Sequence, residues 1–306
     1  YENSTTMGRP GMNKKIVNSY LMADGSRFTD KAGYETMTFD QECQNRDPRL
    51  AQTIRTPGYT RIGSTKKEAP NLAYTMTGYH LVKYSMTANY DEYNKSCNDI
   101  PLFRTAEVYL NFAEAKAELG TLKQADINKS IKLLRDRVGM TNLDMELANS
   151  KPDPYLMSAA TGYPNVEGAN QGVILEIRRE RTIELAMEGF RYYDIMRWKE
   201  GKLFENDLLG IYVPGPGTYD LDKDGTDDVC FYVGTKPAGN VPLYLEIGEQ
   251  IRLSNGESGY IICHSLITKK WNEDRDYLYP VPISERTLSN GVITQNPGWN
   301  DGLNFN

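Results

Sequence analysis

The stretch IPLFRTAEVYLNFAEAKAELG, residues 100–120, decides the fold class of this chain. Its apolar residues recur at alternating spacings of three and four, which is the period of one face of an α-helix. Pro101 suits a first helical turn, and Gly120 ends the pattern. The sequence therefore predicts an amphipathic helix whose inner face carries Phe103, Ala106, Leu110, Ala113 and Ala117.

A second helix is predicted directly after it. Ile127, Ile131, Leu134 and Val138 repeat the helical spacing, and Gly139 ends it. The small alanines of the first helix allow the second to approach closely, which indicates an antiparallel pair. Such a pair of about 34 to 38 residues has the size of a tetratricopeptide unit, and one unit needs neighbours to stack against.

A third long helix is predicted from about residue 173 to 199, with an apolar stripe of Ile183, Ala186, Phe190 and Tyr193. Glu180, Glu184 and Glu188 follow one another at intervals of four on this helix. Carboxylates so placed could bind a metal or act as acid and base, but no histidine accompanies them at helical spacing. Arginines on the same helix favour a structural lattice of ion pairs instead.

The remaining segments have no long helical period. Residues 1–98 and 141–172 are predicted to be mostly irregular, with an occasional strand such as 80–84 in the first segment. Short strands are expected at 229–233 and 260–263, and the tail after Trp271 is expected to lack helix. No interdomain linker is recognisable, so residues 1–306 are predicted to form a single domain.

Composition narrows the function classes. The chain has 306 residues, is 39% hydrophobic and 25% charged, and contains no apolar run of the length that crosses a bilayer. Its 35 basic and 41 acidic side chains give a net charge of −6, so nothing drives binding to nucleic acid.

Cysteine and histidine chemistry is also disfavoured. The four cysteines form no C-x-x-C pair, which argues against a zinc or redox site, although disulfides stay open. The two histidines, His80 and His264, have no partners at ligand or triad spacing.

An acidic segment from Asp220 to Asp228 resembles a calcium-binding loop. Its oxygen ligands would come from positions 1, 3, 5, 7 and 9, with a glycine at position 6 for the sharp turn. Phe231 stands where a bidentate glutamate usually completes such a loop, so a solvated hairpin loop is the alternative. The predicted metal ligands are Asp220, Asp222, Asp224, Thr226 and Asp228.

The motifs described above resemble those of the SusD/RagB family, surface lipoproteins of Bacteroidetes that take part in nutrient uptake. Residues 100–115 are similar to its IPLFRxAExxLxxAEA signature, and residues 128–139 are similar to its second helix. Residues 180–198 match its ER-x-x-EL-x-x-EG-x-R-x-x-D-x-x-RW helix. The segments 279–282 and 295–299 are similar to its closing YPIP and QNPG motifs, and 45–50 is similar to a further family stretch.

The resemblance implies a mainly α fold of tetratricopeptide-like helix pairs with long irregular loops and a few short strands. It also implies a protein without catalytic activity that binds oligosaccharides at the cell surface. The protein would deliver them to a TonB-dependent, SusC-like transporter of the outer membrane. A lipid on an N-terminal cysteine would anchor it there. Because Tyr1 follows neither a signal peptide nor such a cysteine, we expect the chain to be a C-terminal portion.

Tyrosine supplies the candidate binding residues. The chain has 21 tyrosines but only 8 phenylalanines, and a phenol ring can stack on a sugar while its hydroxyl donates a hydrogen bond. We predict that Tyr59, Arg61, Tyr74 and Tyr79 contact the ligand. A peptide- or protein-binding scaffold is an alternative, as is a surface glycosidase that uses two acidic residues.

Overall fold

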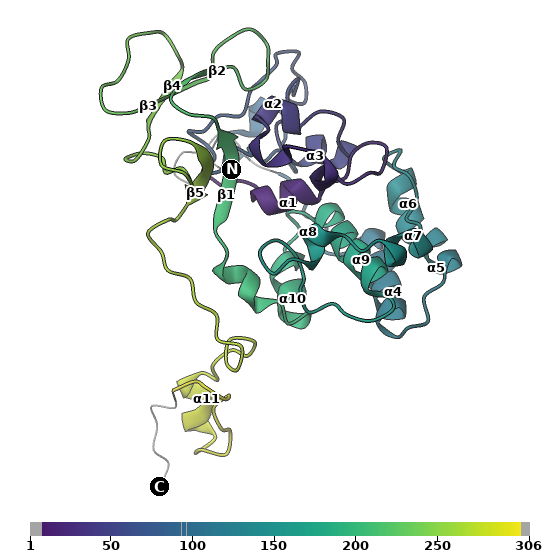
Figure 1. Cartoon of the computed structure of the whole chain (residues 1–306). Coiled ribbons are helices and arrows are strands. Elements are labelled where there is room, and N and C mark those ends of the chain that lie inside the picture. The colour runs from purple at the N-terminus through teal and green to yellow at the C-terminus, as the bar shows by residue number, and fades with distance from the viewer. Residues whose placement is uncertain (1–7, 93, 96, 301–306) are drawn as a thin grey trace.

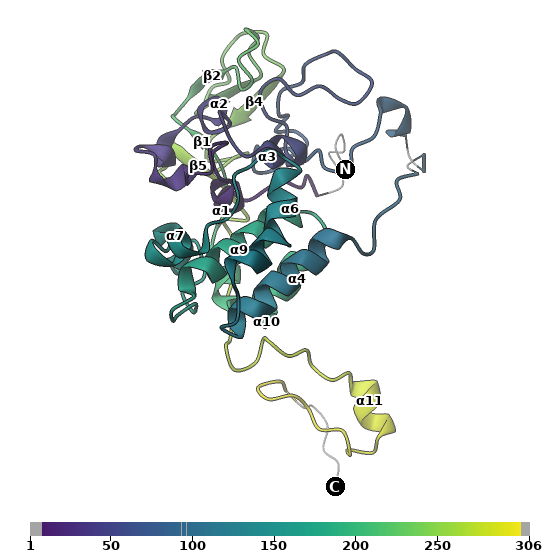
Figure 2. The same ribbon diagram turned by 90° about the vertical axis from the view of Figure 1, so that its right-hand side faces the viewer.

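The computed structural model describes residues 8–92, 94–95 and 97–300. One side of the molecule is helical and the other is built from short strands and loops, with α1 (Lys14–Ser19) close to where they meet (Figure 1). A C-terminal segment that carries α11 (Ile283–Leu288) projects away from both (Figures 1 and 2). The fold is thus mainly helical with two small sheets, as the sequence predicts at this level.

The first predicted helix is confirmed as α4 (Thr105–Glu118). Ala106, Leu110, Ala113 and Ala117 are buried, as their spacing predicts, whereas Phe103 precedes the helix and is 88% exposed. Gly120 follows with a φ of +68°, a left-handed conformation that favours glycine. The buried face of α4 packs against α9 (Gln171–Glu184) and α6 (Ile131–Asp136).

The second predicted helix is interrupted, which corrects the sequence prediction. It consists of α5 (Gln124–Asn128) and α6, separated by Ser130 with φ −132° and ψ −90°. The Ser130 hydroxyl donates a 2.8 Å hydrogen bond to the carbonyl of Asp126. A serine side chain that bonds the preceding turn in this way competes with the continuing helix.

The third predicted helix is likewise two helices, α9 and α10 (Phe190–Arg197). Met187 and Gly189 between them have φ values of +66° and +84°, so the chain turns out of the helix there. Arg181 of α9 and Asp194 of α10 form a buried ion pair of 2.7 Å that joins the two helices. Tyr193, which was expected on the apolar stripe, is 65% exposed.

Short helices occupy segments that were expected to be irregular. Before α4 the structure has α1, α2 (Phe39–Glu42), α3 (Pro48–Thr53) and the 3₁₀ turns η1 (Phe28–Asp30), η2 (Tyr34–Thr36) and η3 (Ala88–Tyr90). The expected strand at 80–84 amounts to single bridges of His80 with Gly11 and of Leu81 with Ile54. Beyond α6 lie α7 (Met145–Ser150), α8 (Pro154–Met157) and η4 (Gly201–Glu205), and α11 occupies the tail.

Several of these short helices begin with a local capping signal. The side chains of Asn13, Asp47, Asp144 and Asp153 each accept a hydrogen bond from a backbone amide in the first turn. Proline occupies the first turn of α3 and α8. Helices of four to six residues have too little periodicity to be detected by hydrophobic spacing alone.

The strands form two sheets. β1 (Leu208–Val213) pairs with β5 (Gly259–Cys263) in antiparallel fashion. In the second sheet, β3 (Val229–Tyr232) lies between β2 (Gly217–Tyr219), which is antiparallel to it, and β4 (Leu243–Glu246), which is parallel. The strands expected near 229 and 260 are therefore confirmed as β3 and β5.

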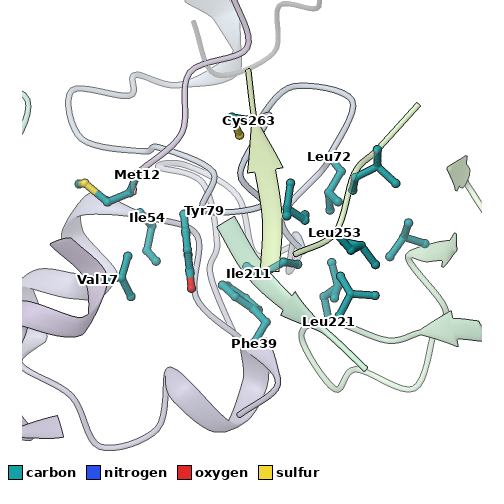
Figure 3. Close-up of a cluster of buried hydrophobic side chains, with 14 of the residues drawn as sticks. Met12, Val17, Phe39, Ile54, Leu72, Tyr79, Ile211, Leu221, Leu253 and Cys263 are labelled. Carbon is teal, nitrogen blue, oxygen red and sulfur yellow. The ribbon is translucent and has the colours of Figure 1, made fainter. Parts of the chain in front are cut away.

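Two hydrophobic cores stabilise the fold. One lies under α4, α6 and α9. The other joins the first helices to the strands and contains Tyr79, Phe39, Ile211 and Leu253 side by side (Figure 3). The four cysteines are free, so the disulfides that the sequence left open are not formed among them. None of the helices in the described residues has the length and apolar character to cross a membrane.

Candidate functional site

A hollow of about 500 Å³ lies between the loop 66–73 and the acidic loop that follows β2. Both walls carry polar as well as apolar side chains, and the two loops are far apart in sequence. One wall presents cationic and amide side chains and the other presents carboxylates. The residues on its walls include Arg55, Lys66, Lys67, Asn71, Asp224, Thr226, Asp227 and Asp228.

Backbone pairing fixes the first wall. Thr60 and Lys67 form an antiparallel bridge, and the amide of Glu68 donates a 3.0 Å hydrogen bond to the carbonyl of Tyr59. Arg55 forms a 3.1 Å ion pair with Glu68, and its guanidinium lies 5.3 Å from the centre of the Tyr59 ring. Tyr59 is half-buried. It therefore supports a residue on the wall and keeps part of its ring exposed.

Tyr74 lies directly after the wall segment. It is half-buried, and its ring centre is 6.2 Å from that of His80. The amide of Asn71 donates to Nδ1 of His80 at 3.3 Å, while the Asn71 side-chain oxygen accepts a hydrogen bond from Ala73. These contacts stabilise the turn that carries Asn71 and Tyr74.

The other two predicted binding residues have structural roles. Arg61 is buried and forms a two-pronged ion pair with Asp91 at 2.6 and 2.5 Å, and it also donates to the Met86 carbonyl. Tyr79 has no exposed surface, and its hydroxyl donates to Glu42 at 2.7 Å. Burial, reinforced by the Glu42 charge, raises the pKa of Tyr79 well above its usual value. A fully buried ring cannot stack on a sugar, so the prediction for Tyr79 is corrected.

The acidic loop forms the second wall and gathers carboxylates. The side chains of Asp220, Asp222 and Asp224 place oxygen atoms within 4.8 Å of one another. Gly225 makes the sharp turn with a φ of +93°. Phe231 is buried in β3, so position 12 of the loop supplies no ligand.

Burial and the neighbouring carboxylates raise the pKa values of two aspartates in this loop. Burial, together with the Asp224 carboxylate, raises the pKa of Asp222. Asp228 is affected in the same way, and its pKa rises to about 6. Within the described part of the chain, Asp222 forms no ion pair with a lysine or arginine, although it is 93% buried (7% exposed). A hard cation at this loop would relieve the repulsion, and oxygen ligands are those that calcium prefers.

Part of the predicted cation loop lines this hollow, through Asp224, Thr226 and Asp228. None of the four predicted binding residues lines it, although Tyr59 is hydrogen-bonded through its carbonyl to Glu68 on the wall and Tyr74 follows the wall residue Ala73. Sequence reasoning missed Lys66, Lys67, Asn71 and Asp227 on its walls, because single polar residues in a loop carry no periodic or spacing signal. Closely spaced donors and acceptors of this kind suit a ligand rich in hydroxyl groups.

The glutamates of α9 are paired with arginines. Burial alone would raise the pKa of Glu180, but the charges of Arg49 and Arg135 outweigh it and lower the pKa to about 2. Glu184 pairs with Arg49, Arg104 and Arg137. The predicted ion-pair lattice is confirmed, with the correction that its arginines come mostly from other segments.

Comparison with known proteins assigns the family. The model of the SusD family matches residues 2–299. The chain belongs to the SusD family. No curated protein is significantly similar to it in sequence. The resemblance seen in the helical motifs is therefore confirmed.

Solved structures of SusD-like proteins agree with this fold. A SusD-like carbohydrate binding protein from Bacteroides fragilis is 22% identical, with a TM-score of 0.55 over 90% of this chain and 47% of its own. A second SusD-like protein from Bacteroides fragilis is also 22% identical, with a TM-score of 0.55 over 94% of this chain and 47% of its own. The chain thus spans about half the length of the solved SusD-like chains that it matches.

Proposed function

We propose that this SusD-family chain binds oligosaccharides in the hollow between the loop 66–73 and the acidic loop, without cleaving them. The observation that carries the proposal is the lining of this hollow, which brings lysine, amide and carboxylate side chains together. Tyr59, whose carbonyl is hydrogen-bonded to Glu68 on the wall, and Tyr74, which follows Ala73 on the wall, lie next to it. Sugars need such a combination of hydrogen bonds to their hydroxyl groups and a ring surface under their C–H faces.

Alanine substitution of the two tyrosines tests the site. We expect the double variant Tyr59→Ala/Tyr74→Ala to bind an oligosaccharide at least about ten-fold more weakly in calorimetry, which is about 1.4 kcal/mol. The matched control is Tyr193→Ala, which removes an exposed tyrosine from α10, outside the hollow. Undiminished affinity in the double variant, or an equal loss in the control, would overturn the assignment.

A parallel measurement separates the alternatives. If the chain only binds, incubation with polysaccharide releases no new reducing ends, whereas a glycosidase would release them. A panel that includes peptides as well as glycans distinguishes a glycan-binding hollow from a peptide-binding one. Binding of peptides alone would replace the glycan proposal with the scaffold alternative.

We further propose the cellular setting that the family resemblance implies. The protein would be a lipid-anchored component of the outer-membrane surface that passes its ligand to a TonB-dependent, SusC-like transporter. In this setting α4 and α6 would act as a tetratricopeptide-like pair, with α9 stacked on α4. Co-purification of the tagged protein with an outer-membrane barrel from its native host tests the partnership, and recovery without a barrel would contradict it.

Calcium is the cation that we propose for the acidic loop. Asp220, Asp222 and Asp224 would be the principal ligands, with Thr226 and Asp228 completing the loop. Their oxygen donors fit a hard divalent cation, whose charge would stabilise this wall of the hollow.

Calcium titration tests that proposal. At a concentration ten times the dissociation constant, we expect about 1.4 kcal/mol of added stability, followed as a rise in Tm. Asp222→Asn should remove the effect. Asp227→Asn, an exposed neighbour outside the carboxylate cluster, should retain it. No heat of binding and no change in Tm with millimolar calcium would refute the site.

A further inference from the structure

The turn that follows β5 exposes large apolar side chains. Leu266 is 80% exposed and Ile267 is 60% exposed. The amide of Ile267 donates a 3.0 Å hydrogen bond to the carbonyl of His264, which closes the turn. Leu208, which pairs with Cys263 where β1 and β5 meet the turn, is 39% exposed. We call Leu208, Leu266 and Ile267 the apolar tip, and apolar side chains gathered in this way mark a contact surface.

Basic side chains lie close to the apolar tip. Lys269 and Lys270 follow it directly in the sequence, and Lys270 is exposed. Burial lowers the pKa of Lys15 in α1 to about 8, the carboxylate of Asp207 opposes this shift, and the charge of Lys269 adds to it. Lys15 and Lys269 are therefore near enough for their charges to repel each other.

Arg9 belongs to the same cluster. Burial raises the pKa of the Cys263 thiol to about 11, and the charges of Arg9 and Lys269 act in the opposite direction. Both cations therefore lie near the end of β5, next to the apolar tip. Among the described residues, none of Arg9, Lys15, Lys269 and Lys270 forms an ion pair with a carboxylate. We call these four residues the basic rim.

The basic rim differs in charge from the molecule as a whole. The chain has a net charge of −6, so its overall field repels an anionic partner. The four cations of the rim lie near the carboxylate of Asp207. The next carboxylates along the chain, Glu273 and Asp274, come after Trp271, whose ring lies 5.2 Å from that of Phe204 in η4. The apolar tip is therefore flanked by positive charge, which complements a negatively charged surface.

We propose that the apolar tip and the basic rim dock on an anionic lipid surface. Leu266 and Ile267 enter the headgroup region, and Lys270 pairs with lipid phosphates. Such a surface offers hydrocarbon and negative charge together, which is the combination that these side chains match. The inference rests on the membrane setting proposed above. It adds a second contact, which fixes the orientation of the protein body on the membrane, because a flexible lipid anchor alone leaves that body free to rotate.

Other partners match the surface less well. A second copy of the chain, docked symmetrically through the apolar tip, brings two basic rims together, and like charges across an interface oppose association. A free anion such as inorganic phosphate pairs with the basic rim but leaves Leu266 and Ile267 in water.

Flotation with lipid vesicles tests the proposal on the 306-residue chain. One set of vesicles contains equal parts of phosphatidylglycerol and phosphatidylcholine, and the other contains phosphatidylcholine alone. At low ionic strength we expect the chain to float with the anionic vesicles and not with the neutral ones, and added salt should release it. No association with the anionic vesicles, or equal association with both sets, would overturn the proposal.

Two variants separate insertion from charge attraction. Leu266→Ser/Ile267→Ser removes most of the apolar tip without a change in charge and should weaken the association at least about ten-fold. Lys270→Gln should weaken it about five-fold, the effect of one cation beside an anionic membrane. The matched controls are Leu147→Ser on α7 and Lys129→Gln directly after α5, and neither should change the association. Figure 1 shows α5 and α7 across the molecule from β5.

Three results would contradict docking through the tip. They are full association of the serine variant, equal losses in the two controls, and a concentration-dependent dimer that only the serine variant lacks. Calorimetry with oligosaccharide on the same variants keeps the two proposals apart, because the hollow is lined by other residues and its affinity should not change. Failure to bind vesicles therefore leaves glycan binding intact, and loss of glycan binding in Tyr59→Ala/Tyr74→Ala leaves vesicle binding intact.

Discussion

Two buried regions of the molecule differ in composition. The charged region consists of Glu180 on α9 with its partners Arg49 and Arg135, whereas the apolar region is the core that contains Tyr79 and Ile211. In the first region, Glu180 is completely buried between Arg49 and Arg135, at 2.5 and 2.8 Å. In the second, Ile54, Ile211 and Phe39 lie next to Tyr79 (Figure 3). Apolar packing depends on volume and tolerates small changes, but a buried charge depends on one specific partner.

The largest expected loss of stability follows from removing one member of the charged region. Glu180→Ala leaves two buried guanidinium groups with fewer partners, so we expect a loss of about 3 to 5 kcal/mol in the free energy of unfolding. Equilibrium unfolding in urea measures it. The control is Asp136→Ala, which breaks the exposed pair with Lys132 and should cost less than about 0.5 kcal/mol. Equal losses in the two variants would contradict the comparison.

Acid should weaken the charged region before the apolar one. The pKa of Glu180 is about 2 in the folded protein and 4.5 in its ordinary state. A carboxylate with a lowered folded pKa adds stability above pH 4.5, and this stability is lost as the pH falls toward 2. The shift corresponds to about 3 kcal/mol. Urea unfolding between pH 6 and pH 3 should show the decline, and Glu180→Gln should flatten it; an unchanged slope in this variant would count against the assignment.

The smallest expected effect comes from a polar contact inside the apolar region, the hydrogen bond between Tyr79 and Glu42. Tyr79→Phe removes the hydrogen bond to Glu42, which keeps its ion pair with Lys14. We expect a loss of about 1 kcal/mol in the free energy of unfolding, because a charged acceptor loses one of two partners. A loss as large as that of Glu180→Ala would contradict this, because it would mean that buried Glu42 depends on Tyr79 as strongly as the guanidinium groups depend on Glu180.

Sequence patterns predicted the parts of the fold that repeat. The spacing of Ala106, Leu110, Ala113 and Ala117 located α4 because burial of one helical face imposes that period. The same reasoning missed the breaks at Ser130 and Gly189, since the apolar period continues across both while the backbone leaves the helix. Local hydrogen bonds and left-handed residues decide such breaks, and hydrophobic spacing does not record them.

The hollow was only partly predictable. Tyr74 and Tyr79 stand in the same loop-rich segment, yet Tyr74 is half-buried and Tyr79 is fully buried. Outside regular structure, no period indicates which side of the chain faces the core. The acidic loop was recognisable because its aspartates are closely spaced in the sequence, whereas its position opposite residues 66–73 is set by tertiary packing alone.

The ionic network of α9 also constrains the order in which substitutions can accumulate. Arg49, Arg135 and Glu180 come from three separate segments, and each is neutralised by the others. A substitution at one of these positions lowers the stability of the protein until a compensating substitution occurs at another. We therefore expect the three positions to change together during evolution. Exposed pairs such as Lys132–Asp136 impose no such constraint, because water can solvate the charge that is left when one partner is replaced.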